Sequence, residues 1–176
     1  SWFAQSQYAL NNTSGCHADS SGRNWPTWAG DYFVETFMAA GAANMVGGAC
    51  PTLDGFHIDN VFYQPRSQAY LGQLGDWNED GTPESDASAA TIQQQGFVQT
   101  ANAMRSHPEM AGKLIFGNTD YYLQLPLANI DAFRNNLNGA LLEGFIGYDY
   151  SVERWGGTNG FALLMAGYRH VMDSLL

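Results

Sequence analysis

The sequence is poor in basic residues and has no long apolar run. Seven Lys and Arg residues stand against seventeen Asp and Glu residues, which gives a formal net charge of -10, and Lys113 is the single lysine. A chain with this charge repels phosphate backbones, so nucleic acid is not expected as a partner. No apolar run approaches the roughly 20 residues of a membrane-spanning helix, so no membrane association is predicted.

Charged residues are also scarce. They make up 14% of the chain, compared with roughly 25% in typical soluble domains. Gly, Asn, Gln, Ser, Thr and aromatic residues take their place. Such a surface is typical of a secreted or periplasmic protein that handles neutral polar ligands such as sugars. Cys16 and Cys50 lie in Gly-rich segments, which predicts a disulfide in an oxidising compartment; two unrelated thiols are the alternative.

Three short apolar segments end in polar residues and are predicted to be strands. They are Leu53–Phe62 (LDGFHIDNVF), Lys113–Asp120 (KLIFGNTD) and Gly139–Gly144 (GALLEG). Segments of helical character lie around them, namely Trp28–Ala43, Ser88–His107, Leu127–Asn136 and Thr158–Leu175. Alternation of short strands and helices predicts a parallel sheet with crossover connections. In the last helix, periodicity predicts a buried side formed by Ala162, Leu163, Ala166, Val171 and Leu175.

This pattern predicts an α/β fold of the (β/α)8 TIM-barrel type. A complete barrel typically needs about 250 residues, whereas the chain has 176. Residues 1–176 are therefore interpreted as a single partial-barrel catalytic domain, whose remaining barrel segments belong to a longer chain. In such a barrel the carboxyl ends of the strands meet at one mouth. The polar residues predicted to converge there are Asp59, Asn118, Asp120 and Glu143.

Paired carboxylates at converging strand ends are the groups that glycoside hydrolysis requires. Asp59 follows an apolar run, where a carboxylate is costly to bury unless it is paired or functionally poised. Glu143 lies in an aromatic-rich region that suits a general acid with a raised pKa. An Asx turn or a helix cap is the alternative explanation for Asp59. Asn118 and Asp120 are candidates for binding sugar hydroxyls, with Asn118 also a candidate for orienting Asp59; strand-ending turns are the alternative.

Aromatic residues supply candidates for sugar stacking, because their rings offer large, rigid and partly polar surfaces. Trp2, Trp25 and Tyr148 are the candidates for substrate binding, and packing within the protein is the alternative for each.

An acidic segment between the first two predicted strands has the spacing of a calcium loop. Oxygen-bearing side chains occupy alternate positions at Asp76, Asn78, Asp80 and beyond to Glu84, with Gly81 in the sixth position. Ala87 stands in the twelfth position, where a bidentate Glu belongs. The two interpretations are a structural calcium ion held by Asp76, Asn78, Asp80 and Glu84, and a polar turn that shapes the cleft beside Asp59. No other cofactor is expected.

Four motifs in order, LDGFHIDNVF, GDWNEDG, LIFGN and ALLEGF, resemble a known family. They are similar to TIM-barrel glycoside hydrolases related to the endo-α-1,4-polygalactosaminidases, over roughly Asn24 to Gly144. The resemblance implies that the chain contains about strands 4–6 with helices 3–6. It also implies that Asp59 is the strand-four nucleophile of a retaining mechanism and Glu143 the strand-six acid/base, with Asp54 at the structural end of the strand. His57 stands where the family usually has an apolar residue.

Two other functions use the same residues. Asp59, Asp120 and Glu143 are hard oxygen ligands suited to a divalent cation such as Mg²⁺ in a metal-dependent barrel enzyme. The third interpretation is a catalytically silent carbohydrate-binding protein, since fold does not dictate function.

Overall fold

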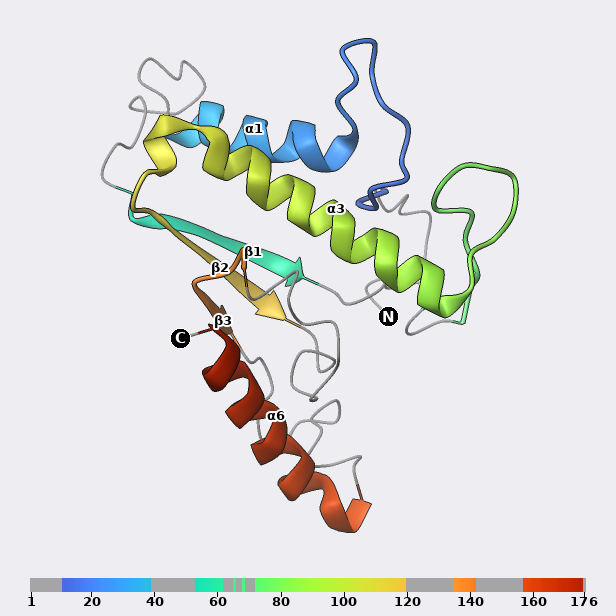
Figure 1. The fold of residues 1–176 in the computed structure, drawn as a ribbon, viewed down its shortest axis with the longest axis vertical. Helices are drawn as coiled ribbons and strands as arrows, with labels where there is room; N and C mark the ends of the chain where they lie inside the picture. The colour runs from blue at the N-terminus through green and yellow to red at the C-terminus, as the bar shows by residue number, and fades with distance from the viewer. Residues whose placement is uncertain are drawn as a thin grey trace, which may run out of the picture.

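The computed structural model describes residues 11–38, 53–61, 65, 68, 72–119, 135–141 and 157–175. Figure 1 shows the arrangement of their helices and strands. In chain order these elements are α1 (Trp25–Phe37), β1 (Gly55–Val61), α3 (Asp86–Ser106), the 3-10 helix η1 (Pro108–Met110), β2 (Leu114–Thr119), β3 (Gly139–Leu141), the 3-10 helix η3 (Gly157–Asn159) and α6 (Gly160–Leu175).

The described strands form one parallel sheet in the order β1-β2-β3, and these three strands do not close into a barrel. Gly55 pairs with Leu114 at the amino ends of β1 and β2, and Phe116 pairs with Gly139 between β2 and β3. Each strand lies within one of the three apolar segments identified in the sequence. The predicted α/β class with a parallel sheet is therefore confirmed.

Two helices, α1 and α3, pack against each other over one face of the sheet (Figure 1). Their close approach depends on Gly30, because a Cβ atom there would stand 2.4 Å from the carbonyl oxygen of Thr100. Between helices and sheet lies the apolar core, whose buried members are Val34, Met38, Val61, Phe97, Ala101, Met104, Met110, Ile115 and Leu137. Burial of these side chains is the main favourable term that holds the helices on the sheet.

Side-chain hydrogen bonds from capping residues determine where α1 and α3 begin. α1 begins three residues before the predicted Trp28, because the Asn24 side chain accepts a hydrogen bond from the Thr27 amide at 3.2 Å and Pro26 lies in the first turn. Ser85 caps α3 in the same way. Of the helix predicted at 127–136, only residues 135 and 136 are described, and they lie in a turn.

The opposite face of the sheet, here called the open face, carries large apolar side chains that are partly exposed and is not covered by α1 or α3. Leu114 is 40% exposed, Phe116 39% and Leu141 49%. Together with His57 and the neighbouring backbone they line a cavity of about 520 Å³ on this face. Parallel sheets are normally buried on both faces. This sheet is covered on one face by α1 and α3, and apolar side chains stand exposed on the other.

The last helix, α6, follows β3 and lies apart from α1 and α3 (Figure 1). Its predicted buried side is wrong where it can be compared: Ala162, Leu163 and Ala166 are exposed, whereas Leu164 and Gly167 are buried. The side chains of Val171 and Leu175 lie outside the described residues. The apolar residues of this helix are distributed around most of its circumference, so the periodicity of the sequence alone does not identify the buried face. No helix in the described part of the chain has the length and hydropathy needed to cross a membrane.

Candidate functional site

Asp59 and Asn118 meet at the carboxyl ends of neighbouring strands. The Asn118 Nδ2 atom donates a hydrogen bond to Oδ1 of Asp59 at 2.7 Å, across 59 positions of sequence. Asp59 is exposed and Asn118 is half-buried. The structure therefore places these two predicted site residues together at the edge of the sheet where barrel enzymes carry their catalytic groups.

A register irregularity in β1 accompanies this contact. Ile58 pairs with Gly117 and Val61 with Thr119, so β1 advances three residues while β2 advances two. The extra residue falls at Asp59 or Asn60 and forms a β-bulge or a similar irregularity. Bulges bend a strand and redirect side chains, and they are frequent beside active sites. Asp59 thus lies where the ladder is locally interrupted.

His57 lies toward the amino end of the same strand. It is exposed and pairs in register with Phe116, and both residues line the cavity on the open face. The described lining of this cavity does not include Asp59. His57 therefore points toward the open face and away from the helices. It stands where the family that the motifs resemble usually has an apolar residue.

Several predicted site residues lie outside the described residues. They are Asp120 and Glu143, together with the aromatic candidates Trp2 and Tyr148. Their predicted roles stay predictions.

Trp25 is described, and its contacts are within the protein. It is the first residue of α1, and its ring stacks on that of Trp28 with the centroids 4.8 Å apart. The stack continues to Tyr32, at 4.9 Å from Trp28. The Trp25 Nε1 atom donates to Oδ1 of Asn12 at 2.8 Å. These contacts agree with the packing alternative for Trp25.

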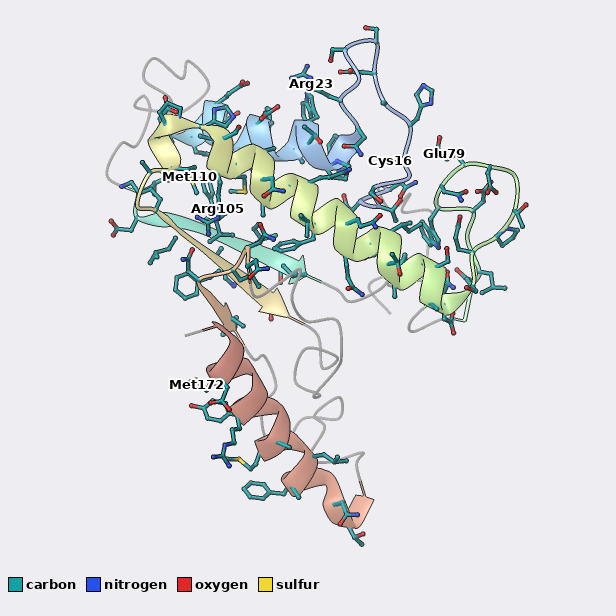
Figure 2. All side chains as sticks on the ribbon, viewed as in Figure 1. Cys16, Arg23, Glu79, Arg105, Met110 and Met172 are labelled. Atoms are coloured by element: carbon teal, nitrogen blue, oxygen red, sulfur yellow. The ribbon has the colours of Figure 1, made fainter. Side chains whose placement is uncertain are left out.

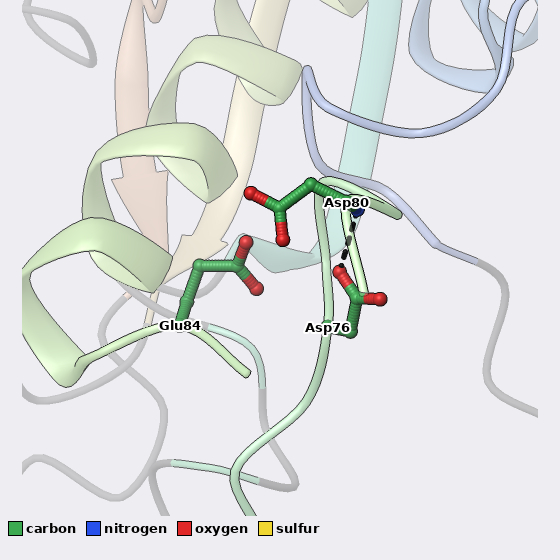
Figure 3. A group of neighbouring side chains, drawn as sticks. All are labelled: Asp76, Asp80 and Glu84. Atoms are coloured by element: carbon green, nitrogen blue, oxygen red, sulfur yellow. Dashed lines mark hydrogen bonds between the residues drawn. The ribbon is translucent and has the colours of Figure 1, made fainter. Parts of the chain in front are cut away.

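The acidic segment folds into a tight loop before α3. One carboxylate oxygen from each of Asp76, Asp80 and Glu84 lies within 4.8 Å of the other two, and Figure 3 shows the three side chains grouped around the loop. Oδ1 of Asp76 accepts from the Asp80 amide at 3.0 Å, and its Oδ2 accepts from the Gly81 amide at 2.8 Å. Glu84 is 6% exposed and accepts from the amides of Trp77 and Asn78. The fourth predicted ligand, Asn78, donates through Nδ2 to Asp80 at 3.0 Å.

This loop is attached to the segment that precedes α1. The side chains of Asn11 and Thr13 both donate to the carbonyl oxygen of Trp77, each at 2.9 Å. A Cβ atom on Gly15 would stand 2.7 Å from Cα of Asn78, so the two backbones are in close contact. Figure 2 shows Cys16 and Glu79 on these two segments near the amino-terminal half of α3. Contacts between residues so far apart in sequence carry no local signal from which they could have been predicted.

Cys16 is a free, buried thiol in the structure. Burial is the largest influence on it and raises the pKa of the thiol, with a further increase from the negative charge of Glu79. Cys50, its predicted partner, lies outside the described residues. The structure thus contains no bond from Cys16 to support the predicted disulfide.

Comparison of the chain with protein-family profiles, with curated proteins and with solved structures finds no match. The resemblance to glycoside hydrolases therefore rests on the four sequence motifs.

Proposed function

We propose that the protein is a retaining glycoside hydrolase in which Asp59 is the nucleophile and Glu143 the acid/base. The observation that carries this proposal is the hydrogen-bonded pair of Asp59 and Asn118 at the carboxyl edge of the parallel sheet. Leu141 pairs with Asn118 in the next strand, and Glu143 follows Leu141 by two positions. Two neighbouring strands thus supply an aspartate and an amide, and by its position in the sequence Glu143 is proposed as the second carboxylate.

The arrangement of the sheet favours a partial barrel. The three strands are parallel and follow one another in chain order, and α1 and α3 cover the same face. A doubly wound sheet instead has helices on both faces and a point where strand order reverses. We propose that β1, β2 and β3 correspond to strands 4–6 of a barrel. The open face would then be the barrel interior, covered by the remaining barrel segments of a longer chain.

In the proposed reaction, a carboxylate oxygen of Asp59 attacks the anomeric carbon of a polysaccharide. Glu143 gives its proton to the glycosidic oxygen as that bond breaks, and a covalent glycosyl-enzyme forms. Glu143 then accepts a proton from water, which attacks the anomeric carbon and releases Asp59. The two steps use only the polysaccharide, the two carboxyl groups and water, so the proposed reaction requires no cofactor. Retention requires carboxyl groups about 5 to 5.5 Å apart.

The first test compares Asp59→Asn with Asp54→Asn, two changes of the same chemistry near opposite ends of β1. The substrates are a panel of neutral polysaccharides and an α-1,4-linked galactosamine polymer, with release of reducing ends as the measurement. Loss of the nucleophile should lower kcat by about a thousandfold or more, whereas Asp54→Asn should leave the rate within about twofold because that side chain is exposed at the far end of the strand. Equal rates in the two variants would contradict the proposal.

The two alternatives give different results in the same assay. A metal-dependent enzyme using Asp59, Asp120 and Glu143 would lose activity in a chelator and regain it with Mg²⁺. A silent carbohydrate-binding protein would bind a polysaccharide equally well after Asp59→Asn and would hydrolyse none at any pH. A glycosyl adduct on Asp59, trapped with a 2-fluoro glycoside and detected by mass spectrometry, would support the retaining mechanism against both.

A further inference from the structure

We infer that Phe116 is a sugar-binding residue, whose ring leans over Gly139 and forms an aromatic platform next to the Asp59–Asn118 pair. The inference rests on the proposed glycosidase function for the identity of the ligand, which is a neutral pyranose unit of the polysaccharide. The apolar C–H face of this unit stacks on the ring, because aromatic rings offer large and rigid contact surfaces. Phe116 binds the substrate in this way and takes no part in breaking the bond.

Phe116 lies on the same face of the sheet as the candidate pair. Successive side chains of a strand point to opposite faces. In β2, Ile115 belongs to the core under the helices, so Phe116 and Asn118 both point to the open face. The two residues are about 6.6 Å apart along the strand. Because Asn118 donates to Asp59, the ring lies close to the proposed nucleophile and on the same face.

A glycine in the neighbouring strand lets the ring lean across β3. Gly139 pairs in register with Phe116, and a Cβ atom on Gly139 would stand 2.3 Å from Cε1 and 2.7 Å from Cδ1 of the ring. Non-bonded carbon atoms prefer separations of about 3.5 to 4 Å, so the ring occupies the space that a side chain at position 139 would fill. The ring therefore rests against the β3 backbone, and 39% of the residue remains exposed.

The cavity beside the ring has a lining that suits a neutral ligand. Its volume of about 520 Å³ falls in the range of small-molecule sites, about 300 to 1,000 Å³. Leu114, Phe116 and Leu141 are its large apolar members on this face, and Asp54 and His57 are its polar members. The described lining residues include no Lys or Arg, and the chain has a net charge of -10. An anionic ligand is therefore repelled, whereas a neutral sugar is not.

Packing against further barrel segments is the competing explanation for the exposed ring. The interior of a barrel is filled by layers of side chains in which branched aliphatic residues dominate, and packed interiors contain few voids larger than a water molecule. Here the cavity wall includes Asp54 and His57, whose polar groups are costly to bury without partners. A polar ligand in contact with them avoids that cost. The composition of the wall therefore favours a binding cavity over a packed layer.

The experiment compares Phe116→Leu, which removes the ring, with Phe116→Tyr, which keeps it. Gly139→Ala is the third variant, because its added methyl group displaces the ring without changing it. Phe33→Leu is the matched control, since Phe33 has nearly the same exposure, 38%, but belongs to α1. All four changes are made in the Asp59→Asn protein, so that the ligand is not hydrolysed during the titration.

The probes are cellotetraose, mannotetraose, maltotetraose and galactotetraose, and isothermal titration calorimetry measures the dissociation constants. For the probe that binds most tightly, Phe116→Leu and Gly139→Ala should weaken binding about tenfold, whereas Phe116→Tyr and Phe33→Leu should change it by less than about twofold. With ¹³C-labelled Phe rings, the Phe116 signal, assigned from Phe116→Leu, should shift when the probe binds. Should Phe116→Leu fail to fold, Gly139→Ala and the ring signal decide the result.

Binding and hydrolysis together separate this inference from the proposed function. Binding that depends on the ring supports the inference even where the native protein hydrolyses no polysaccharide, and the missing hydrolysis then counts against the glycosidase. Hydrolysis by the native protein, with the affinity unchanged in Phe116→Leu and Gly139→Ala, keeps the glycosidase and overturns the inference. Absence of binding for every probe also overturns it. A loss of stability in Phe116→Leu without a loss of affinity assigns the ring to packing.

Discussion

The two faces of the sheet differ in how completely they are covered. On the helix side, α1 and α3 bury Ile115 fully, together with Val34 and Met104. On the open side, Leu114 and its neighbours remain 39 to 49% exposed, and the Asp59–Asn118 pair lies at the carboxyl edge. The helix side therefore contributes most of the stability, while the opposite side carries partly exposed apolar side chains and the candidate chemistry lies at the carboxyl edge.

Adjacent residues on β2 test this difference most strongly. Ile115→Ala should lower the free energy of unfolding by about 3 kcal/mol, because it removes a fully buried side chain from the core. Leu114→Ala should lower it by about 1 kcal/mol or less, since that side chain is 40% exposed. Urea denaturation of both variants measures the two values. Equal losses would mean that the open face is covered in solution.

The acidic loop, which precedes α3 and contacts the segment before α1, tests whether the attachment of these helices also depends on an ion. If calcium binds there with a dissociation constant 100-fold below its concentration, it should stabilise the protein by about 2.7 kcal/mol and raise the melting temperature. Asp80→Asn should abolish the increase, whereas Glu109→Gln on η1, a change of the same kind outside the acidic loop, should keep it. Thermal denaturation with calcium, with magnesium and with a chelator measures the effect. An unchanged melting temperature in the native protein would favour the polar-turn interpretation.

Alanine substitution at two glycines tests the same difference between the two sides by adding a single methyl group to each. A Cβ atom on Gly96 in α3 would stand 2.0 Å from the backbone oxygen of Asn12, so Gly96→Ala should cost about 2 kcal/mol. A Cβ atom on Gly139 would meet the ring of Phe116 at 2.3 Å, but that ring is 39% exposed and can rotate away. Gly139→Ala should therefore cost less than about 1 kcal/mol. Chemical denaturation measures both, and the reverse order would contradict the open face.

The smallest expected effect concerns Cys16. Burial raises the pKa of its thiol, so the folded state favours the neutral form. This contribution to stability is fully present below the pKa of the unfolded thiol and is lost as pH rises through the folded value. Alkylation of Cys16 by iodoacetamide near pH 8 should be at least about tenfold slower in the folded protein than in urea. Equal rates would show that the thiol is accessible, and protection that persists in urea but disappears on reduction would indicate a disulfide.

Much of the architecture could be predicted from local patterns. The apolar segments at Leu53–Phe62 and Lys113–Asp120 contain β1 and β2, and the helical pattern at Ser88–His107 matches α3 within two residues at each end. Both signals arise within a few neighbouring residues, as propensity and capping do. The buried side of α6 could not be predicted, because Leu163 and Leu164 are equally apolar and only their neighbours in space distinguish them.

For the candidate site, the sequence by itself determined that Asp59 and Asn118 lie near the carboxyl ends of strands and that Asp76, Asp80 and Glu84 share one acidic segment. The tertiary structure alone decided that the Asn118 amide donates to Asp59, that the register slips beside Asp59, and that Leu114, Phe116 and Leu141 stay partly exposed on one face of the sheet. The physical reason is that strand order and register depend on contacts between residues far apart in the chain, which no short stretch of sequence specifies.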